Sequence, residues 1–155
     1  MHNDALTENG KNLEFVTLIA GQQSFCIDIK LIREIRRWSP VTKLPHSPGH
    51  VLGVMNLRGA VIPIIDLASI LGFGHIDPTT RHVVIIASIE DRIVGLLVDS
   101  VSEILSITED KLQETPRIRD DETNYCIQGI IAIEDDITRI IDLKTLLPKI
   151  SRVAA

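Results

Sequence analysis

Three aspartates are the residues of this chain whose spacing could support acid–base chemistry. Asp66, Asp99 and Asp142 each follow an apolar run, which is where a catalytic carboxylate can lie at the exit of a strand. A carboxylate at that position more commonly accepts hydrogen bonds from the backbone of the next turn. We therefore expect caps, with a hydrolase that uses Asp66 or Asp142 as the enzymatic alternative.

Two histidines have the i, i+4 spacing that zinc ligands often have on a helix. His46 and His50 flank Ser47-Pro48-Gly49, however, and a proline at that position prevents a continuous helix. We expect two loop histidines and no metal, and a loop-borne metal pair is the alternative.

Two cysteines could be reactive thiols, a disulfide or a metal pair. Cys26 and Cys126 both lie inside apolar segments. Such cysteines are typical of buried, reduced thiols, which is the expectation here; a disulfide or metal pair is the alternative.

Motifs that mark other enzyme classes are missing. The chain has no G-x-S-x-G, no H-E-x-x-H and no Walker loop, and Gly72-Phe73-Gly74 lacks the third glycine of a dinucleotide fingerprint. We predict a protein that is not an enzyme and that has no cofactor.

The composition favours sheet over long helices. Apolar residues make up 45% of the 155 residues but aromatic residues only 3%, so branched aliphatic side chains must fill the core. A net charge of -5 argues against nucleic acid as a partner. No apolar run reaches 18 residues, and the start of the chain is polar, so we expect a cytoplasmic protein with no direct membrane insertion and a flexible tail at residues 1–12.

The elements that must position these residues are short strands separated by turns. Single helical turns are predicted after Asp66 and Asp142, where an acidic residue can cap the first turn. The expected strands, from alternation and turn residues, are 14–20, 24–29, 32–37, 51–57, 61–66, 83–89, 92–98, 101–107, 126–133 and 137–142.

The chain also repeats itself. Residues 25–35 align without a gap on residues 94–104, so that Glu34 matches Glu103 at an offset of 69. A second pair of segments, 53–67 and 129–143, keeps a glycine and an aspartate in step at an offset of 76. This predicts two copies of one five-stranded unit, about 13–72 and 82–148, within a single domain over 13–148.

A unit of 60 residues is marginally stable alone, so the two copies should pack on each other and leave a groove at the seam. Closure into small barrels would remove exposed strand edges. The sequence does not decide whether the copies exchange strands.

Four ordered segments resemble the CheW family of chemotaxis coupling proteins. The segments are 25–35, 41–67, 92–101 and 140–147, and the most specific part is the run N-L-R-G-A-V-I-P-I-I-D-L at 56–67. The resemblance covers nearly the whole chain, about 14–147. It implies an all-β fold of two five-stranded SH3-like β-barrels side by side, with short helical turns between strands.

The resemblance also implies partners. Family members are adaptors that join the regulatory domain of a CheA-type histidine kinase to the cytoplasmic hairpin tip of chemoreceptors in membrane-associated arrays. A generic SH3-like peptide binder is the third hypothesis, and four Phe and Tyr residues are too few for its aromatic groove.

Site residues follow from the same resemblance. Asn56 and Gly59 belong to a structural turn in which Gly59 supplies a positive φ. Arg58, within that turn, is expected to tie one barrel to the other or to pair with a partner carboxylate. Glu34 is expected to point outward while its apolar neighbours point in. The implied receptor-binding groove consists of Ile32, Glu34, Ile35, Arg58, Val101 and Ile104.

Overall fold

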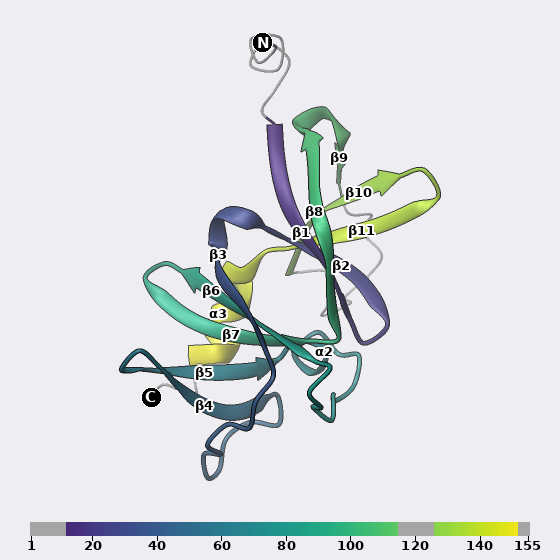
Figure 1. Cartoon of the computed structure of the whole chain (residues 1–155). Helices are drawn as coiled ribbons and strands as arrows, with labels where there is room; N and C mark the ends of the chain where they lie inside the picture. The colour runs from purple at the N-terminus through teal and green to yellow at the C-terminus, as the bar shows by residue number, and fades with distance from the viewer. Residues whose placement is uncertain (1–11, 115–125, 152–155) are drawn as a thin grey trace.

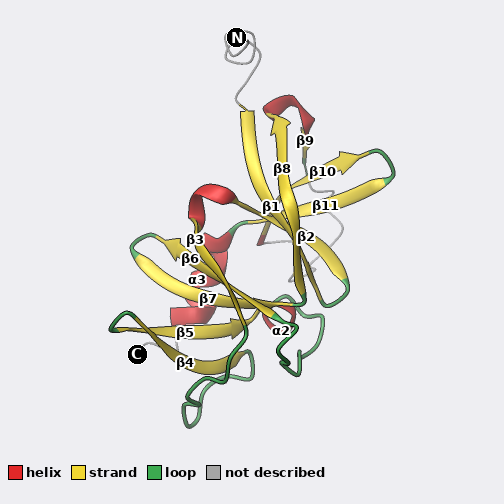
Figure 2. Ribbon diagram, in the orientation of Figure 1, coloured by secondary structure: helices red, strands yellow, loops and turns green. Residues whose placement is uncertain are grey.

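Two β-sheets make up most of the molecule. The computed structural model describes residues 12–114 and 126–151, and Figures 1 and 2 show the two sheets at an angle to each other with a helix beside them. The expected tail lies outside the described residues except for Asn12, which begins the first strand.

Every expected strand is present, with bounds that differ by two residues at most. The strands are β1 (Asn12–Ala20), β2 (Gln23–Asp28), β3 (Ile32–Arg37), β4 (Val51–Leu57), β5 (Ala60–Asp66), β6 (Val83–Ile89), β7 (Arg92–Val98), β8 (Ser100–Thr108), β9 (Leu112–Gln113), β10 (Ile127–Ile133) and β11 (Asp136–Ile141). The helical segments are η1 (Ile29–Leu31), α2 (Leu67–Ile70), η2 (Glu109–Lys111) and α3 (Leu143–Ser151).

The two copies exchange strands, a point that the sequence left open. One sheet has the order β8-β1-β2-β11-β10-β9 and the other has the order β3-β6-β7-β5-β4. Each copy thus contributes its first hairpin, β1–β2 or β6–β7, to one sheet and its remaining strands to the other. The barrels are therefore not the contiguous halves 13–72 and 82–148, because each barrel needs strands from both.

Two short connections carry the chain from one sheet to the other. The first is η1, which is capped by Asp28; the Lys30 N–H donates to Asp28 Oδ1 at 2.9 Å. The second is Asp99, whose N–H donates to the Ile19 carbonyl at 2.8 Å. At both connections the next strand joins the other sheet: β3 follows η1 into the five-stranded sheet, and β8 follows Asp99 into the six-stranded sheet.

Each sheet curls as an SH3-like barrel. Within the described residues the hydrogen-bonded ladders run from one edge strand to another without closing. The expected fold class, all-β with two such barrels side by side, is confirmed in this open form.

A shared core holds the sheets together. One cluster takes fully buried residues from both sheets, including Leu18 and Phe25 from the first and Ile85 and Leu96 from the second. Two smaller clusters fill the individual barrels. Because one continuous core serves both sheets, they form a single packing unit.

The last helix is longer than the single turn expected after Asp142. The helix α3 has nine residues and continues past Pro148. Leu143, Leu146 and Ile150 are buried in the shared core at helical spacing. Tertiary packing of this apolar face explains the extra length.

Gly53 marks a close approach of two backbones. Its φ is 148°, and a Cβ atom there would lie 2.3 Å from the Thr42 carbonyl oxygen. Thr42 and Val54 exchange two backbone hydrogen bonds beside it, at 2.9 and 2.8 Å. Its repeat mate Gly129 lies next to β9, so this short strand, which the sequence analysis missed, is the second copy's version of the same bridge.

Candidate functional site

Glu34 and Arg58 form an ion pair across the open end of one barrel. Glu34 lies on β3, the edge strand of the five-stranded sheet, and Arg58 lies in the turn between β4 and β5 at the opposite edge. Arg58 Nη1 donates to Glu34 Oε2 at 2.8 Å. The expectation that Arg58 ties one barrel to the other is corrected, because its partner belongs to the same sheet.

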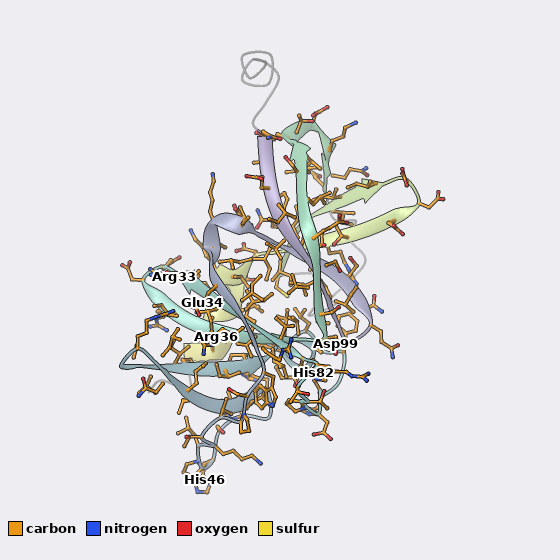
Figure 3. The ribbon with its side chains drawn as sticks, viewed as in Figure 1. Arg33, Glu34, Arg36, His46, His82 and Asp99 are labelled. Carbon is orange, nitrogen blue, oxygen red and sulfur yellow. The ribbon has the colours of Figure 1, made fainter. Side chains whose placement is uncertain are left out.

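Arg36 completes this cluster. Its Nη1 donates to Glu34 Oε1 at 3.0 Å, and Figure 3 labels both residues. Each carboxylate oxygen of Glu34 therefore has an arginine as its partner. Hydrogen bonds from Arg58 and then from Arg36 hold the pKa of Glu34 below its usual range. Glu34 is therefore ionised and held in one place near neutral pH.

The turn that carries Arg58 has the geometry that its residues favour. Arg58 and Gly59 have φ values of 51° and 89°, as a two-residue hairpin with a primed turn requires. The Gly59 N–H donates to Asn56 Oδ1 at 2.8 Å. Asn56 and Gly59 thus set the direction in which Arg58 leaves the hairpin.

Ile32 and Val101 occupy equivalent positions in the two copies. Ile32 begins β3 and Val101 lies near the start of β8. Both are partly buried and pack against the shared core. Each therefore anchors an edge strand at the junction of the sheets.

Ile35 and Ile104 also form a pair of repeat mates, and both are exposed. Ile35 is 45% exposed and Ile104 is 57% exposed. The expectation that Ile35 points inward is wrong. Ile35 lies three residues after the partly buried Ile32, and an odd separation along a strand places two side chains on opposite faces. Glu34 therefore shares the partly buried face with Ile32, and Ile35 faces solvent.

The structure thus brings some of the expected site residues into contact and leaves others apart. It brings Glu34 to Arg58 by an ion pair, and Ile32 and Val101 to one core cluster. Across residues 12–114 and 126–151, no hydrogen bond, ion pair or core cluster links Ile35 or Ile104 to either pair. Arg36 is the site residue that sequence reasoning missed, although its position two residues after Glu34 on a strand was a usable signal.

Two of the three aspartates at the strand exits, Asp66 and Asp142, are structural caps, whereas the Asp99 carboxylate faces His82. Asp66 is fully buried, and it accepts hydrogen bonds from the N–H groups of Ser69 at 3.1 Å and Ile76 at 2.7 Å. Asp142 accepts a hydrogen bond from the Lys144 N–H at 3.1 Å. Both carboxylates thus have the capping role that the sequence favoured over catalysis.

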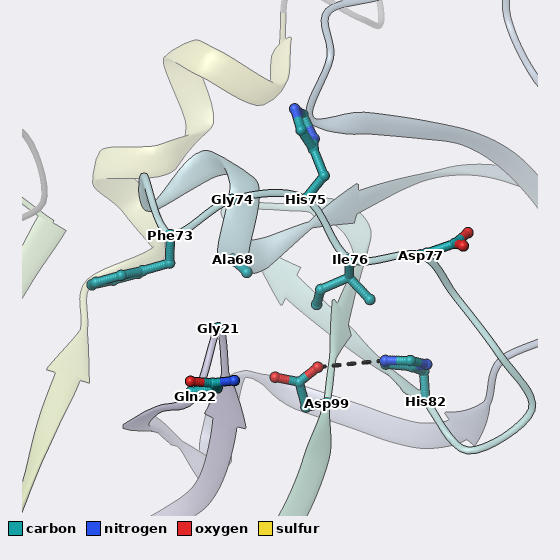
Figure 4. Close-up of a pocket in the computed structure, with 10 residues that line it drawn as sticks. All are labelled: Gly21, Gln22, Ala68, Phe73, Gly74, His75, Ile76, Asp77, His82 and Asp99. Atoms are coloured by element: carbon teal, nitrogen blue, oxygen red, sulfur yellow. Dashed lines mark ion pairs between the residues drawn. The ribbon is translucent and has the colours of Figure 1, made fainter.

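A polar hollow of about 430 Å³ lies beside the β1–β2 turn, between Gly21 and the segment after α2 (Figure 4). His82 Nε2 lies 3.4 Å from Asp99 Oδ1 in this hollow. The Thr79 N–H donates to His82 Nδ1 at 2.9 Å, so Nε2 carries the hydrogen that faces Asp99. Among the described residues no Ser or Cys lines the hollow, and the Thr79 hydroxyl lies 3.2 Å from His82 Nδ1, on the side of the ring away from Asp99.

The two histidines and two cysteines that could bind a metal or react as thiols form no common site. His46 is exposed and His50 is partly buried, both in the loop before β4. Cys26 and Cys126 are buried, as expected, and lie in different core clusters. In the part of the chain that the structure describes, no group of three or more His, Cys, Asp or Glu residues could hold a metal ion.

These features define a class of protein: a small all-β scaffold whose distinctive groups are surface charges and exposed aliphatic residues on strand edges. The CheW-like domain model matches residues 14–151. The chain therefore belongs to the CheW-like family, and it is a chemotaxis adaptor.

Individual relatives agree with this assignment. The chain is 46% identical over 147 residues to a probable chemotaxis protein CheW of Rhizobium etli, covering 95% of each chain. It is 44% identical over 150 residues to the chemotaxis protein CheW of Rhizobium meliloti, covering 97% of this chain and 96% of the relative. The crystal structure of the scaffolding protein TtCheW from Thermoanaerobacter tengcongensis superimposes with a TM-score of 0.77 at 29% identity, covering 84% of each chain.

None of the helices in residues 12–114 and 126–151 is both long and apolar enough to cross a membrane.

Proposed function

We propose that this chain couples the cytoplasmic hairpin tip of chemoreceptors to the regulatory domain of a CheA-type histidine kinase, by protein–protein contacts and without catalysis. It would act in the cytoplasm, recruited to membrane-associated receptor arrays. The observation that carries the proposal is the placement of Ile35 and Ile104, two exposed aliphatic residues at equivalent positions on the edge strands β3 and β8.

An apolar helical surface suits these two residues. A receptor hairpin tip presents helix faces, and branched aliphatic side chains that are already exposed gain by being covered. Ile32 and Val101 pack against the shared core and keep both edge strands in position. The receptor surface would therefore consist of Ile35 and Ile104, supported from beneath by Ile32 and Val101.

Glu34 would add a fixed charge to this surface. Two arginines hold its carboxylate, so it does not have to be ordered when the partner arrives. A preorganised charge contributes to specificity more than to affinity. We expect it to select a receptor tip that brings a cationic or hydrogen-donating group to this position.

Titration calorimetry with the regulatory domain of the cognate kinase tests the kinase contact. A signalling interface of standard size typically gives a dissociation constant of about 1 μM. Absence of heat at about 100 μM, with both proteins folded, would contradict the proposed coupling. No phosphate should be transferred to this chain when ATP is added to the complex.

Receptor binding is tested separately, with receptor in nanodiscs. Ile35→Ser and Ile104→Ser remove exposed aliphatic groups and should weaken receptor binding while leaving the melting temperature nearly unchanged. Val61→Ser is the matched control, because Val61 is 70% exposed and lies outside the proposed surface. Equal binding by all three variants would exclude β3 and β8 as the receptor surface.

A further inference from the structure

The two barrels have hollows at equivalent ends, and among the described residues an ion pair closes the first hollow but not the second. The first, of about 200 Å³, lies between Glu34 on β3 and the β4–β5 turn. The second, of about 510 Å³, lies between Glu103 on β8 and the β10–β11 hairpin. The repeat aligns Glu34 with Glu103 at an offset of 69, and the two hairpins at an offset of 76.

The sheets agree with this equivalence. The order β3-β6-β7-β5-β4 in one sheet corresponds strand by strand to β8-β1-β2-β11-β10 in the other. Lining residues correspond as well: Ile62 in the first hollow matches Thr138 in the second. The two hollows are thus the same feature of the fold, built twice.

The closing ion pair exists in only one of them. The repeat mate of Arg58 is Glu134, which has the same left-handed turn conformation, with φ values of 51° and 55°. An acidic residue at this position cannot pair with Glu103, so within residues 12–114 and 126–151 no ion pair of the second barrel corresponds to Glu34–Arg58. The larger volume of the second hollow agrees with an end that is left open.

The open hollow combines negative charge with exposed aliphatic surface. Glu103 and Asp136 line it, and Glu134 and Asp135 lie in the adjoining β10–β11 turn; all four side chains are exposed. Ile133 and Ile137, which line it, are 37% and 62% exposed. A side chain with a cationic head and an apolar stem suits such a site. Arginine fits better than lysine, because its planar guanidinium can donate two hydrogen bonds to one carboxylate.

We propose that this second hollow binds an arginine side chain of a partner protein, presented on a turn flanked by branched aliphatic residues. The arginine would lie against Glu103 as Arg58 lies against Glu34, and its neighbours would cover Ile133 and Ile137. The first barrel shows within the chain how an arginine turn closes this end. The proposal goes beyond receptor and kinase coupling and does not depend on either partner.

A blocked peptide with the sequence of residues 54–63, Val-Met-Asn-Leu-Arg-Gly-Ala-Val-Ile-Pro, is the probe. It is titrated to about 5 mM into the 15N-labelled full chain, and the amide shifts are followed. Shifts are expected at residues 102–105 and 133–138, and they should weaken as salt screens the charges. The same peptide with glutamate in place of arginine should bind at least about tenfold more weakly.

Two outcomes of this titration overturn the proposal: no shifts in those segments, or equal affinity of the two peptides. Because neither receptor nor kinase is present, the coupling function can fail or hold independently of the result.

The variant Glu134→Arg gives a second test, because it should close the hollow from within the chain. Its crystal structure should place the new guanidinium within hydrogen-bond distance of Glu103, and the peptide should no longer bind. Asp91→Arg is the matched control: it makes the same charge change in a left-handed turn, at φ 70°, on the other sheet, and should leave peptide binding unchanged. Undiminished binding to Glu134→Arg would overturn the proposal.

Discussion

Arg58 and Glu34 lie at opposite edges of one five-stranded sheet, yet their side chains meet at 2.8 Å. The contact joins the β4–β5 turn to β3 at a place where the hydrogen-bonded ladder leaves a gap. Arg58 remains 72% exposed while it makes this contact. A pair that is accessible and preorganised in this way is suited to a partner surface more than to stabilising the fold.

Charge reversal should therefore separate coupling from folding. Glu34→Lys and Arg58→Glu remove no core volume, so both variants should melt within a few degrees of the parent. At a partner surface the same changes place like charges together, so neither variant should activate the kinase in reconstituted receptor arrays. Arg81→Glu, at an exposed arginine outside the cluster, is the control and should couple normally.

Two results would contradict this expectation. If both variants unfold, the ion pair is a structural requirement of the barrel. If both melt and couple as the parent does, the charges are not read by a partner, and the surface is recognised through its aliphatic residues Ile32, Ile35, Val101 and Ile104 alone.

The pKa of Glu34 should depend on its two arginines in a definite order. Arg58→Ala should raise this pKa toward its ordinary range more than Arg36→Ala does, because the Arg58 hydrogen bond is the larger cause of the lowering. A lowered pKa in the folded protein stabilises it at pH values above the ordinary carboxyl range, and this contribution is lost as the pH falls through the lowered value. Titration of the side-chain carboxyl 13C signal measures the shift, and an unchanged pKa in Arg58→Ala would rule out the ion pair in solution.

Cys26 should be unreactive in the folded protein. Burial raises the pKa of its thiol to about 12, against a smaller opposing effect of the Thr138 hydrogen bond. Because the thiolate is the reactive species, iodoacetamide at about pH 8 should not label Cys26 until denaturant is added. Mass spectrometry with and without denaturant measures this, and labelling of the native protein within minutes would show that the core opens.

Gly53 should tolerate substitution less well than Gly59. Both have positive φ values, so alanine introduces backbone strain of about 1–2 kcal/mol at either position. A Cβ at Gly59 meets nothing within 4 Å, whereas at Gly53 it meets the Thr42 carbonyl. Gly53→Ala should cost about 3 kcal/mol or more, because a clash is added to the strain. Urea unfolding of the two variants compares the costs, and equal losses would mean that the backbone at Thr42 moves freely.

Local patterns were enough to predict the strands and the turn of the candidate site. Alternation and turn residues are properties of neighbouring residues, which is why β3, β4, β6 and β7 have the expected bounds. β9 has only two residues, too few for any pattern. The choice of pairing partner is not local, so no repeat in the sequence could indicate that β3 pairs with β6 of the other copy.

In the candidate site, too, local features could be predicted and contacts between distant residues could not. The turn roles of Asn56, Arg58 and Gly59 could be predicted from the sequence, because a primed turn accepts few residue types at each position. The partner of Arg58 depends on how a curled sheet brings its two edges together. The exposure of Ile35, in contrast, could have been predicted from β3 alone, because its odd separation from Ile32 places it on the opposite face of the strand.

Strand exchange makes the two copies dependent on each other in a way that simple packing would not. A cut in the loop before β6, at residues 77–80, would leave two fragments, and each would hold a hairpin of one sheet and the remaining strands of the other. Neither fragment could complete a barrel, so each should be unfolded alone and the two should fold only when mixed. The intact chain should accordingly melt in a single transition, since neither barrel can lose its strands while the other persists. Had each copy kept its own strands, a weakened copy could have been lost and the other could have remained; after the exchange, both copies must be retained together.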